Sequence, residues 1–192
     1  MSHFFAYLSR MKLIQRWGLM RNTSTENIQE HSLQVALIAH ALAVIHNTRF
    51  GGKINPERVM ALAVYHEVGE VITGDLATPI KYFNPQIKTA FGHIEEIATQ
   101  RLYNMLPEDL RPQYKAYLFP EPGDAGARKL VKAADKICAY LKCVEELKTG
   151  NEEFLKAGEK IRQEINAYGL PEVQYFMEVF VPSFSLTLDE LN

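Results

Sequence analysis

Apolar residues recur at helical spacing along most of the chain, and the first clear stretch covers residues 27–45. One side of this stretch carries residues spaced four, three and four positions apart: His31, Val35, Ile38 and Leu42. That spacing is typical of one face of an α-helix. Asn27 followed by Glu30 has the form of a capping box, which predicts that the helix begins just before His31.

A second helix is predicted from Asn55 and Pro56, because an N-cap residue followed by proline is a typical helix start. Its apolar stripe comprises Val59, Leu62, Ala63 and His66. Glu67 stands beside His66, and Glu70 follows one turn later. The pattern therefore places a histidine on a face that is otherwise directed at the core.

A third helix over residues 129–147 repeats this feature. Asp135 comes four residues after Val131 and three before Cys138, so the helical period directs all three side chains inward. Similar patterns predict helices over residues 84–105 and 152–168. We therefore expect an all-α fold, with residues 1–192 forming one helical domain.

Polar side chains on core-facing stripes need partners, because burying them alone costs free energy. Imidazole and carboxylate groups suit a divalent metal ion that also leaves room for water and substrate. The residues that fit this description are His31, His66, Glu67 and Asp135. Either histidine could instead be a core residue hydrogen-bonded to a backbone carbonyl, and the aspartate could pair with a buried lysine or arginine. Spacing alone leaves both interpretations open.

The order of these residues, a histidine, then a histidine followed by an acidic residue, then an aspartate, resembles the H…HD…D signature of HD-domain phosphohydrolases. Longer segments resemble the bacterial 5'-deoxynucleotidases of that superfamily: SHFFAYLSRMKLIQRWGLMRN, TENIQEHSLQVA, GEVITGDLATPIKYFN, KAADKICAYLKCVEEL and YFMEVFVPSFSLTLDE. The resemblance covers essentially the whole chain. It implies a single HD-domain helical bundle.

One position departs from that signature, because the second ligand pair reads His66-Glu67 instead of His-Asp. Glutamate keeps the carboxylate but adds a methylene, whereas metal–oxygen distances vary by only about 0.2 Å. Three outcomes follow for Glu67: a normal site with another rotamer, a site of weakened metal affinity, or a pocket without metal.

The resemblance implies that one divalent cation, cobalt, manganese or a similar transition metal, is held by His31, His66, Glu67 and Asp135. It also implies that Glu70 and Asp75 are catalytic, orienting or deprotonating water and moving protons. Which of the two is the base and which the acid stays open. On sequence alone Glu70, near Gly69, reads as an exposed helix-end residue.

Substrate contacts follow from the same resemblance. Arg16 is expected to contact the phosphate with its forked guanidinium, and Trp17 to pack against the sugar where a 2'-hydroxyl would lie. Without the resemblance, the sequence would predict that Arg16 is a surface arginine and Trp17 a core tryptophan. The further expected contacts are Asp75, Leu76, Ala77 and Thr78 in the loop, together with His31, Glu67 and Asp135.

The implied reaction is metal-dependent hydrolysis of 2'-deoxyribonucleoside 5'-monophosphates to deoxynucleoside and phosphate. Three alternatives are compatible with the sequence: a metal-free or metal-weakened nucleotide sensor resulting from Glu67, a structural helical adaptor, and an enzyme acting on another small phosphate ester. We favour the hypothesis that the protein is a 5'-deoxynucleotidase.

Composition is compatible with this activity without selecting it. The chain has 192 residues, 47% of them hydrophobic, and a formal net charge of −2, so it lacks the basic footprint of a nucleic-acid polymer binder.

Cys138 and Cys143 lie five residues apart on one predicted helix, where a disulfide is geometrically unfavourable, which fits a reducing cytoplasmic setting. The N-terminal segment intersperses charged with apolar residues, so we expect no membrane segment there. The resemblance further implies a homodimer.

Overall fold

The computed structural model describes residues 1–81 and 83–191, and no β-strand occurs among them. The α-helices are α1 (Phe4–Leu8), α2 (Ile28–Phe50), α3 (Pro56–Val64), α4 (Glu70–Thr73), α5 (Thr78–Lys81), α6 (Pro85–Asn104), α7 (Arg111–Leu118), α8 (Ala125–Lys148), α9 (Leu155–Ala167) and α10 (Pro171–Val179). Short 3-10 helices connect or extend them: η1 (Ser9–Leu13), η2 (Pro122–Asp124), η3 (Glu152–Phe154), η4 (Val181–Ser185) and η5 (Leu188–Leu191). The predicted all-α class is confirmed.

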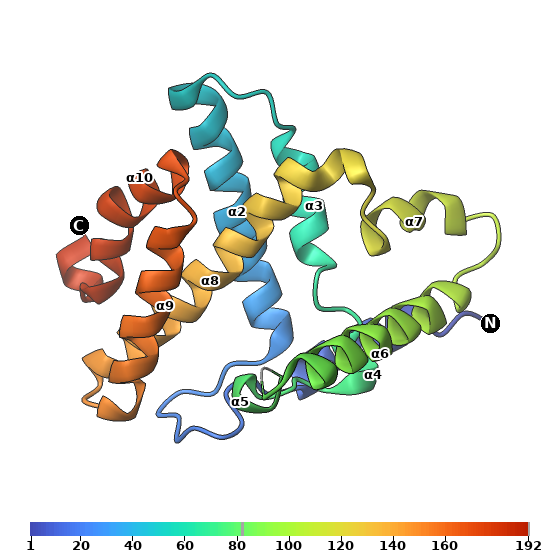
Figure 1. Ribbon diagram of the computed structural model, residues 1–192, viewed down its shortest axis with the longest axis horizontal. Coiled ribbons are helices and arrows are strands. Elements are labelled where there is room, and N and C mark those ends of the chain that lie inside the picture. Colours follow the sequence, from blue (N-terminus) through green and yellow to red (C-terminus); the bar gives the residue numbers. More distant parts are fainter. Residues whose placement is uncertain (82, 192) are drawn as a thin grey trace.

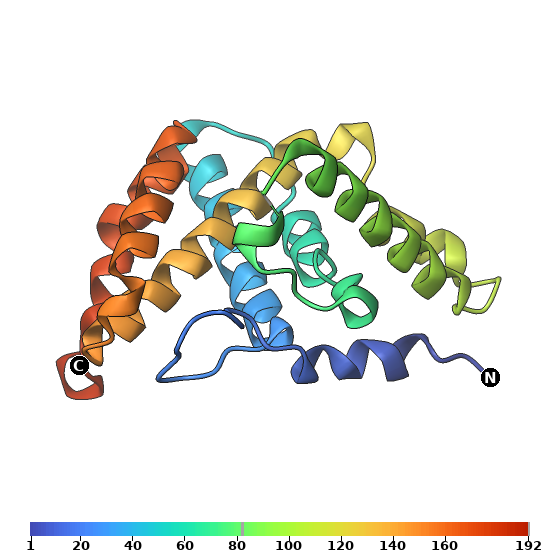
Figure 2. The ribbon, with the colours of Figure 1, turned by 60° about the horizontal axis from the view of Figure 1, so that its bottom comes forward.

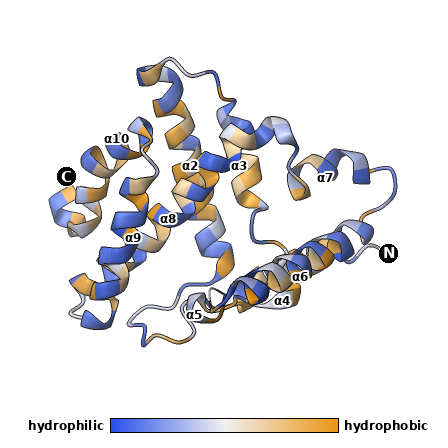
Figure 3. Ribbon diagram, viewed as in Figure 1, coloured by the Kyte–Doolittle hydropathy of each residue, from blue (hydrophilic) through white to orange (hydrophobic). Residues whose placement is uncertain are grey.

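The two longest helices, α2 and α8, cross at the centre of the molecule (Figure 1). Helix α3 packs against both of them, α9 lies against α8, and α10 lies against α2. These five helices share one apolar core, to which each contributes buried side chains such as Val35, Leu62, Ile137, Ile165 and Phe176. Colouring by hydropathy shows apolar residues concentrated along α2 and α3, with more polar residues on the peripheral helix α9 (Figure 3).

Helix α2 is also apolar and long enough to meet a simple length-and-composition test for a membrane span. Half of the relevant window is buried inside the molecule, however, and its apolar residues form the centre of the shared core. The helix therefore has the character of a core helix of a folded domain.

A second apolar cluster joins the N-terminal segment to the rest of the fold. Phe4 of α1, Ile28 of α2 and Leu102 of α6 are all fully buried in it. Figure 2 shows α1 and the loop that follows it along one edge of the molecule, next to the start of α2. This arrangement holds the segment around Arg16 beside the first turn of α2.

The predicted helix starts are confirmed, but one predicted helix is shorter than expected. The side chain of Asn27 caps α2 in a capping box with Glu30, and the side chain of Asn55 caps α3. Helix α3 ends at Val64, so His66 and Glu67 lie in the turn before α4 and not on the helix face predicted for them. In this turn the His66 amide bonds to the Ala63 carbonyl, three residues back and not four.

Candidate metal centre

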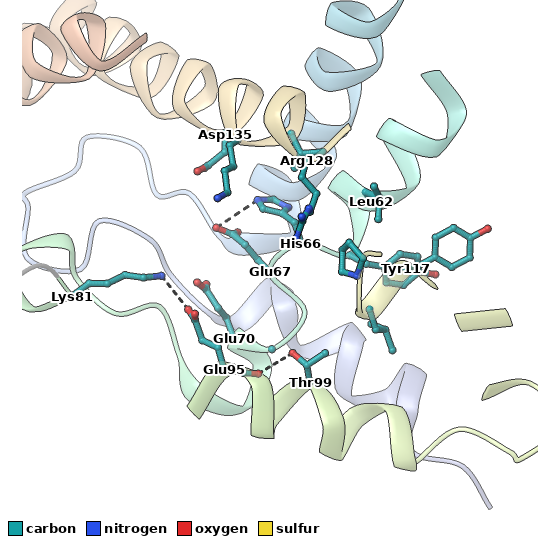
Figure 4. Close-up of a pocket in the computed structure, with 16 residues that line it drawn as sticks. Leu62, His66, Glu67, Glu70, Lys81, Glu95, Thr99, Tyr117, Arg128 and Asp135 are labelled. Atoms are coloured by element: carbon teal, nitrogen blue, oxygen red, sulfur yellow. Dashed lines mark hydrogen bonds and ion pairs between the residues drawn. The ribbon is translucent and has the colours of Figure 1, made fainter. Parts of the chain in front are cut away.

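Four ligand-capable side chains from three parts of the chain meet at one point. They are His31 in the first turn of α2, His66 and Glu67 in the turn after α3, and Asp135 in the middle of α8. One donor atom from each lies within 4.8 Å of the corresponding atoms of the others. Figure 4 shows His66, Glu67 and Asp135 converging from the α3 and α8 sides of the pocket. The structure thus brings together all four residues that the sequence singled out.

The two residues of the turn each carry a buried polar atom that lacks a partner, and Glu67 Oε1 faces the cluster, 3.7 Å from His31 Nε2 and 3.8 Å from His66 Nε2. His66 Nδ1 lies 2.6 Å from the carbonyl oxygen of Ala63, so this nitrogen is the donor and the lone pair is on Nε2. His66 Nε2 and Glu67 Oε2 are both buried, and neither has a hydrogen-bond partner among the residues that the structure describes. Buried polar atoms are almost always paired, so these two atoms need a partner that the described part of the chain does not supply.

The donor set fits one divalent metal ion. Ligand atoms about 2.1 Å from a common ion lie about 3 to 4 Å from one another, which is close to the spread of the four donor atoms. Neutral imidazole and carboxylate oxygens are ligands that first-row transition metals accept. A backbone carbonyl that fixes the second nitrogen of a histidine, as Ala63 does for His66, is a usual feature of metal-binding histidines.

His31 is the most deeply buried member of the cluster, with a side chain 0% exposed. Its Nε2 lies 3.0 Å from Asp135 Oδ1, and its Nδ1 faces Glu26 Oε1 at 3.5 Å. Burial alone would lower the pKa of His31, but the hydrogen bond with Asp135 and the nearby carboxylate of Glu26 raise it to about 9. For Asp135, the opposing effect of burial is outweighed by the bond to His31, and its pKa falls well below the usual range. Without metal, the pair is therefore an imidazolium and a carboxylate.

Arg16 lies against the cluster and is held by two carboxylates. Its Nη1 donates to Glu67 Oε1 at 2.7 Å and its Nε donates to Glu26 Oε2 at 3.1 Å. Burial lowers the pKa of the guanidinium, but the facing carboxylates, led by Glu67 and Asp135, raise it above its ordinary value. Arg16 is thus a permanent positive charge beside the candidate metal ligands. It is not the surface arginine that sequence patterns alone suggested.

Trp17 adopts a left-handed backbone conformation with φ of 58°, uncommon for any residue other than glycine. Its indole nitrogen donates to Glu26 Oε2 at 3.0 Å, and its ring packs on Phe154 with 5.3 Å between centroids. The ring is therefore fixed next to Arg16 by one polar and one apolar contact.

Glu70 and Asp75 form the acidic side of the site. Glu70 is buried at the start of α4, with Oε2 unpaired, which excludes the exposed helix-end position expected from sequence alone. Burial first, and then the charges of Glu67 and Asp75, raise the pKa of Glu70 to about 9. Burial also raises the pKa of Asp75, with a smaller contribution from Glu67. Both carboxyl groups therefore hold a proton more readily than ordinary carboxyl groups do, which suits a general acid.

A cavity of about 370 Å³ opens beside the four residues and extends between α3, α6 and α8 (Figure 4). His66, Glu67, Glu70 and Asp135 line one side of it. Its volume is within the range of small-molecule pockets. Its other walls carry both charged and apolar side chains, among them Lys81, Tyr117, Arg128, Val131 and Lys132.

Sequence patterns did not single out Glu26, although it contacts Arg16, Trp17 and His31. It precedes the N-cap of α2 and belongs to no apolar stripe, so periodicity gave no signal for it. Leu76 and Ala77 lie in the loop before α5, and Thr78 is the first residue of that helix. Contacts of these three residues with substrate stay predictions.

Solved structures show the same fold. An HD-domain phosphohydrolase from Listeria innocua matches 95% of this chain and 88% of its own, with a TM-score of 0.82 and 23% identity. The cyanophage S-2L HD phosphohydrolase DatZ, bound to dA and one catalytic Zn²⁺ ion, matches 93% of this chain and 96% of its own, with a TM-score of 0.66 and 18% identity. The fold is therefore that of HD-domain phosphohydrolases.

Relatives with similar sequences show to which family of HD-domain phosphohydrolases the chain belongs. A 5'-deoxynucleotidase of Vibrio cholerae is 55% identical over 191 residues, covering 100% of this chain and 98% of the relative. One of Erwinia tasmaniensis is also 55% identical, covering 100% of this chain and 96% of the relative. The family model described as 5'-deoxynucleotidase YfbR-like matches residues 3–184. The chain belongs to the YfbR-like 5'-deoxynucleotidase family, which confirms the resemblance recognised in its sequence.

Proposed function

We propose that this protein is a metal-dependent 5'-deoxynucleotidase, which hydrolyses 2'-deoxyribonucleoside 5'-monophosphates to deoxynucleoside and phosphate. The observation that carries the proposal is the cluster of His31, His66, Glu67 and Asp135, with Arg16 beside it. Full-length relatives named 5'-deoxynucleotidase support the substrate class. The dA and Zn²⁺ in the cyanophage structure support a deoxynucleoside and a metal at this kind of site.

In this proposal one divalent cation is held by His31, His66, Glu67 and Asp135. When bound, it supplies Lewis-acid chemistry, polarising phosphoryl oxygens and lowering the pKa of a coordinated water. Ligation by His31 requires that its Nε2 lose the proton it shares with Asp135. Glu67 Oε1, which accepts from Arg16 Nη1 at 2.7 Å, also lies 3.7 Å from His31 Nε2 and 3.8 Å from His66 Nε2, so in this proposal the metal and Arg16 share this carboxylate.

The remaining roles belong to the residues around this cluster. Arg16 binds the phosphate and stabilises the charge on its oxygens during attack. Glu70 and Asp75, both with raised pKa values, orient the attacking water and transfer protons to and from the reacting oxygens.

Selectivity for deoxyribose is proposed to come from Trp17 together with Asp75, Leu76, Ala77 and Thr78. An apolar ring rejects an added hydroxyl only about 100-fold. The fixed Trp17 ring, bonded to Glu26, supplies the rigidity that steric exclusion requires in addition. Bases are expected to be tolerated because these contacts are directed at phosphate and sugar.

We further propose cobalt, manganese or a similar transition metal as the cofactor, a cytoplasmic location, and a homodimer related by two-fold symmetry. The metal follows from the mixed nitrogen and oxygen donor set. Two buried free cysteines, Cys138 and Cys143, support a reducing compartment. Light scattering coupled to size exclusion tests the dimer, for which two-fold pairing is the usual form.

The test of the function is phosphate release by metal-stripped protein, with cobalt, manganese, zinc or magnesium added back. Deoxyadenosine monophosphate is the substrate and adenosine monophosphate the ribose control. We expect metal-restored turnover that favours the deoxy substrate. Folded protein that binds the deoxynucleotide but shows no turnover with any of the metals would refute an enzyme and favour a nucleotide sensor.

A further inference from the structure

One carboxylate outside the four candidate ligands touches three residues of the proposed site. Glu26 Oε2 accepts hydrogen bonds from Arg16 Nε at 3.1 Å and from Trp17 Nε1 at 3.0 Å. Glu26 Oε1 faces His31 Nδ1 at 3.5 Å. The side chain of Glu26 is only 13% exposed, so these contacts are made largely out of water.

The backbone sets Glu26 at this position. An antiparallel bridge joins Gln15 to Asn27, and the amide of Arg16 donates to the carbonyl of Glu26 at 2.9 Å. The two ends of the loop are thereby joined, so Glu26 stands directly opposite the Arg16-Trp17 pair. The following residue, Asn27, caps α2, whose first turn carries His31. Glu26 is therefore the point at which the loop meets the metal-ligand helix.

Each of the three contacts of Glu26 holds a residue that has a different role in the proposed site. The bond to Arg16 Nε orients the guanidinium and leaves its Nη1 directed at Glu67. The bond to Trp17 holds an indole ring whose backbone conformation is uncommon for a side chain of this size. A carboxylate facing His31 Nδ1 favours the tautomer that leaves Nε2 free for a metal, which is a usual arrangement around metal-binding histidines.

The far part of the same loop is held by other residues. The buried Glu146 of α8 accepts from the amide and hydroxyl of Thr23 and from the amide of Ser24, and it pairs with Lys142. These bonds involve neither Arg16 nor Trp17. The attachment of the loop to α8 is therefore separate from the contacts that Glu26 makes.

We propose that Glu26 is a positioning residue that aligns the phosphate-binding Arg16, the sugar-facing Trp17 and the metal ligand His31 through a single carboxylate. This inference rests on the proposed function, because the three residues matter together only if metal and nucleotide share the site. Glu26 itself takes no part in the chemical step. Its loss should therefore disturb metal binding and the environment of Trp17 at the same time.

The test is Glu26→Gln, which keeps the size of the side chain and removes its charge. An amide cannot accept from Arg16 and Trp17 and also from His31 without turning its NH2 group toward one of these donors. Glu145→Gln is the matched control, because Glu145 is an exposed carboxylate whose pKa is raised by burial and, to a lesser extent, by the charge of Glu26, and in the described part of the chain it makes no bond to Arg16, Trp17 or His31. Circular dichroism confirms that each variant is folded.

Two readouts are taken without nucleotide, so that they do not depend on the identity of the substrate. The first is the dissociation constant of manganese or cobalt from stripped protein, measured by competition with a chelator. The second is fluorescence emission, which reports on Trp17 alone because the chain contains one tryptophan. We expect Glu26→Gln to weaken metal binding about 10- to 100-fold and to change Trp17 emission and its quenching by acrylamide. Glu145→Gln should leave both as in the wild type.

If Glu26→Gln does not fold, Glu26→Asp is measured in its place. The shorter carboxylate keeps the charge but cannot reach all three partners, so the same two changes are expected in smaller size. Wild-type metal affinity, or wild-type Trp17 emission, in a folded Glu26 variant would overturn the inference. Absence of deoxynucleotidase activity in the wild-type protein would instead refute the proposed function, and these two readouts would still be informative.

Discussion

Arg16 and Glu67 form a 2.7 Å ion pair between the candidate phosphate-binding residue and a candidate metal ligand. Both side chains are only 12% exposed, so the pair is weakly screened by water. Glu67 stands where the HD signature has aspartate, and its Oε1, which accepts from Arg16, also lies 3.7 Å from His31 Nε2 and 3.8 Å from His66 Nε2. Of the three outcomes expected from the sequence, this geometry favours a metal site in which Glu67 is shared with Arg16.

Glu67→Asp tests this sharing. We expect the shorter carboxylate to lose its direct contact with Arg16 and to bind metal more tightly, by up to about tenfold, since it is no longer divided between two cations. Titration of stripped protein with manganese or cobalt by calorimetry measures the change. Glu67→Gln, which keeps the length and removes the charge, should bind metal more weakly than either. Weaker binding by Glu67→Asp than by the wild type would show that the site requires the length of glutamate.

Glu70 is expected to destabilise the folded, metal-free protein at neutral pH. Its pKa in the folded, metal-free protein is raised to about 9 from 4.5, so the folded state holds a proton that the unfolded state releases above about pH 4.5. Stability should therefore fall as the pH rises from about 4.5 toward 9. Glu70→Gln imitates the neutral acid and should stabilise the stripped protein by up to about 3 kcal/mol at pH 7.

Urea unfolding of the stripped wild type and Glu70→Gln at pH 4.5 and pH 7 measures this difference. We expect no difference at the lower pH and a more stable variant at the higher one. Phosphate release by the metal-loaded variant should fall at least about 100-fold, because general acid–base catalysis contributes that much. A variant that retains most of the activity would remove Glu70 from the catalytic residues.

Metal binding should release a proton from His31. Its folded pKa of about 9 lies above the ordinary value of 6.5, so its protonated form stabilises the metal-free protein fully below pH 6.5. That stabilisation is lost as the pH rises through about 9. Because a metal must displace the same proton, metal affinity should increase about tenfold per pH unit between 7 and 9. Calorimetry in buffers of different ionisation enthalpy counts the released proton, and affinity independent of pH would contradict this role.

Arg16→Lys tests whether phosphate binding needs a guanidinium. Arg16 uses Nε for Glu26 and Nη1 for Glu67, and a lysine ammonium cannot serve both and a phosphate with the same planar geometry. We expect kcat/KM for deoxyadenosine monophosphate to fall at least about tenfold, mainly through kcat if Arg16 acts in the transition state. Steady-state kinetics of the variant with saturating metal provide the measurement. Arg58→Lys, which alters the separate pair with Asp124, is the control.

The sequence predicted most of this architecture because its signals are local. The Asn27 capping box and the Asn55-Pro56 start are confirmed, and the apolar stripes of α2 and α8 place His31 and Asp135 at one cluster. The end of α3 was predicted wrongly, since a 3-10-like turn after Val64 follows from tertiary contacts and not from apolar spacing.

The apolar periodicity of the sequence carried no signal for contacts between distant segments. The environment of Glu70 depends on Glu67 and Asp75, which approach it only in the folded chain, so its burial could not be read from its place near a glycine. The contact of Glu26 with Trp17 depends on a loop closed by a backbone bridge. Periodicity describes which face a helical residue occupies, but it does not describe how a loop returns to a helix.

The metal centre is tested most directly by a titration of stripped protein with manganese, in which bound metal and phosphate release from deoxyadenosine monophosphate are measured in the same samples. We predict that activity rises in proportion to one bound ion per chain, and that folded Asp135→Asn loses both high-affinity binding and activity. Full activity in the absence of bound metal, or wild-type binding and activity in Asp135→Asn, would contradict a metal centre at His31, His66, Glu67 and Asp135.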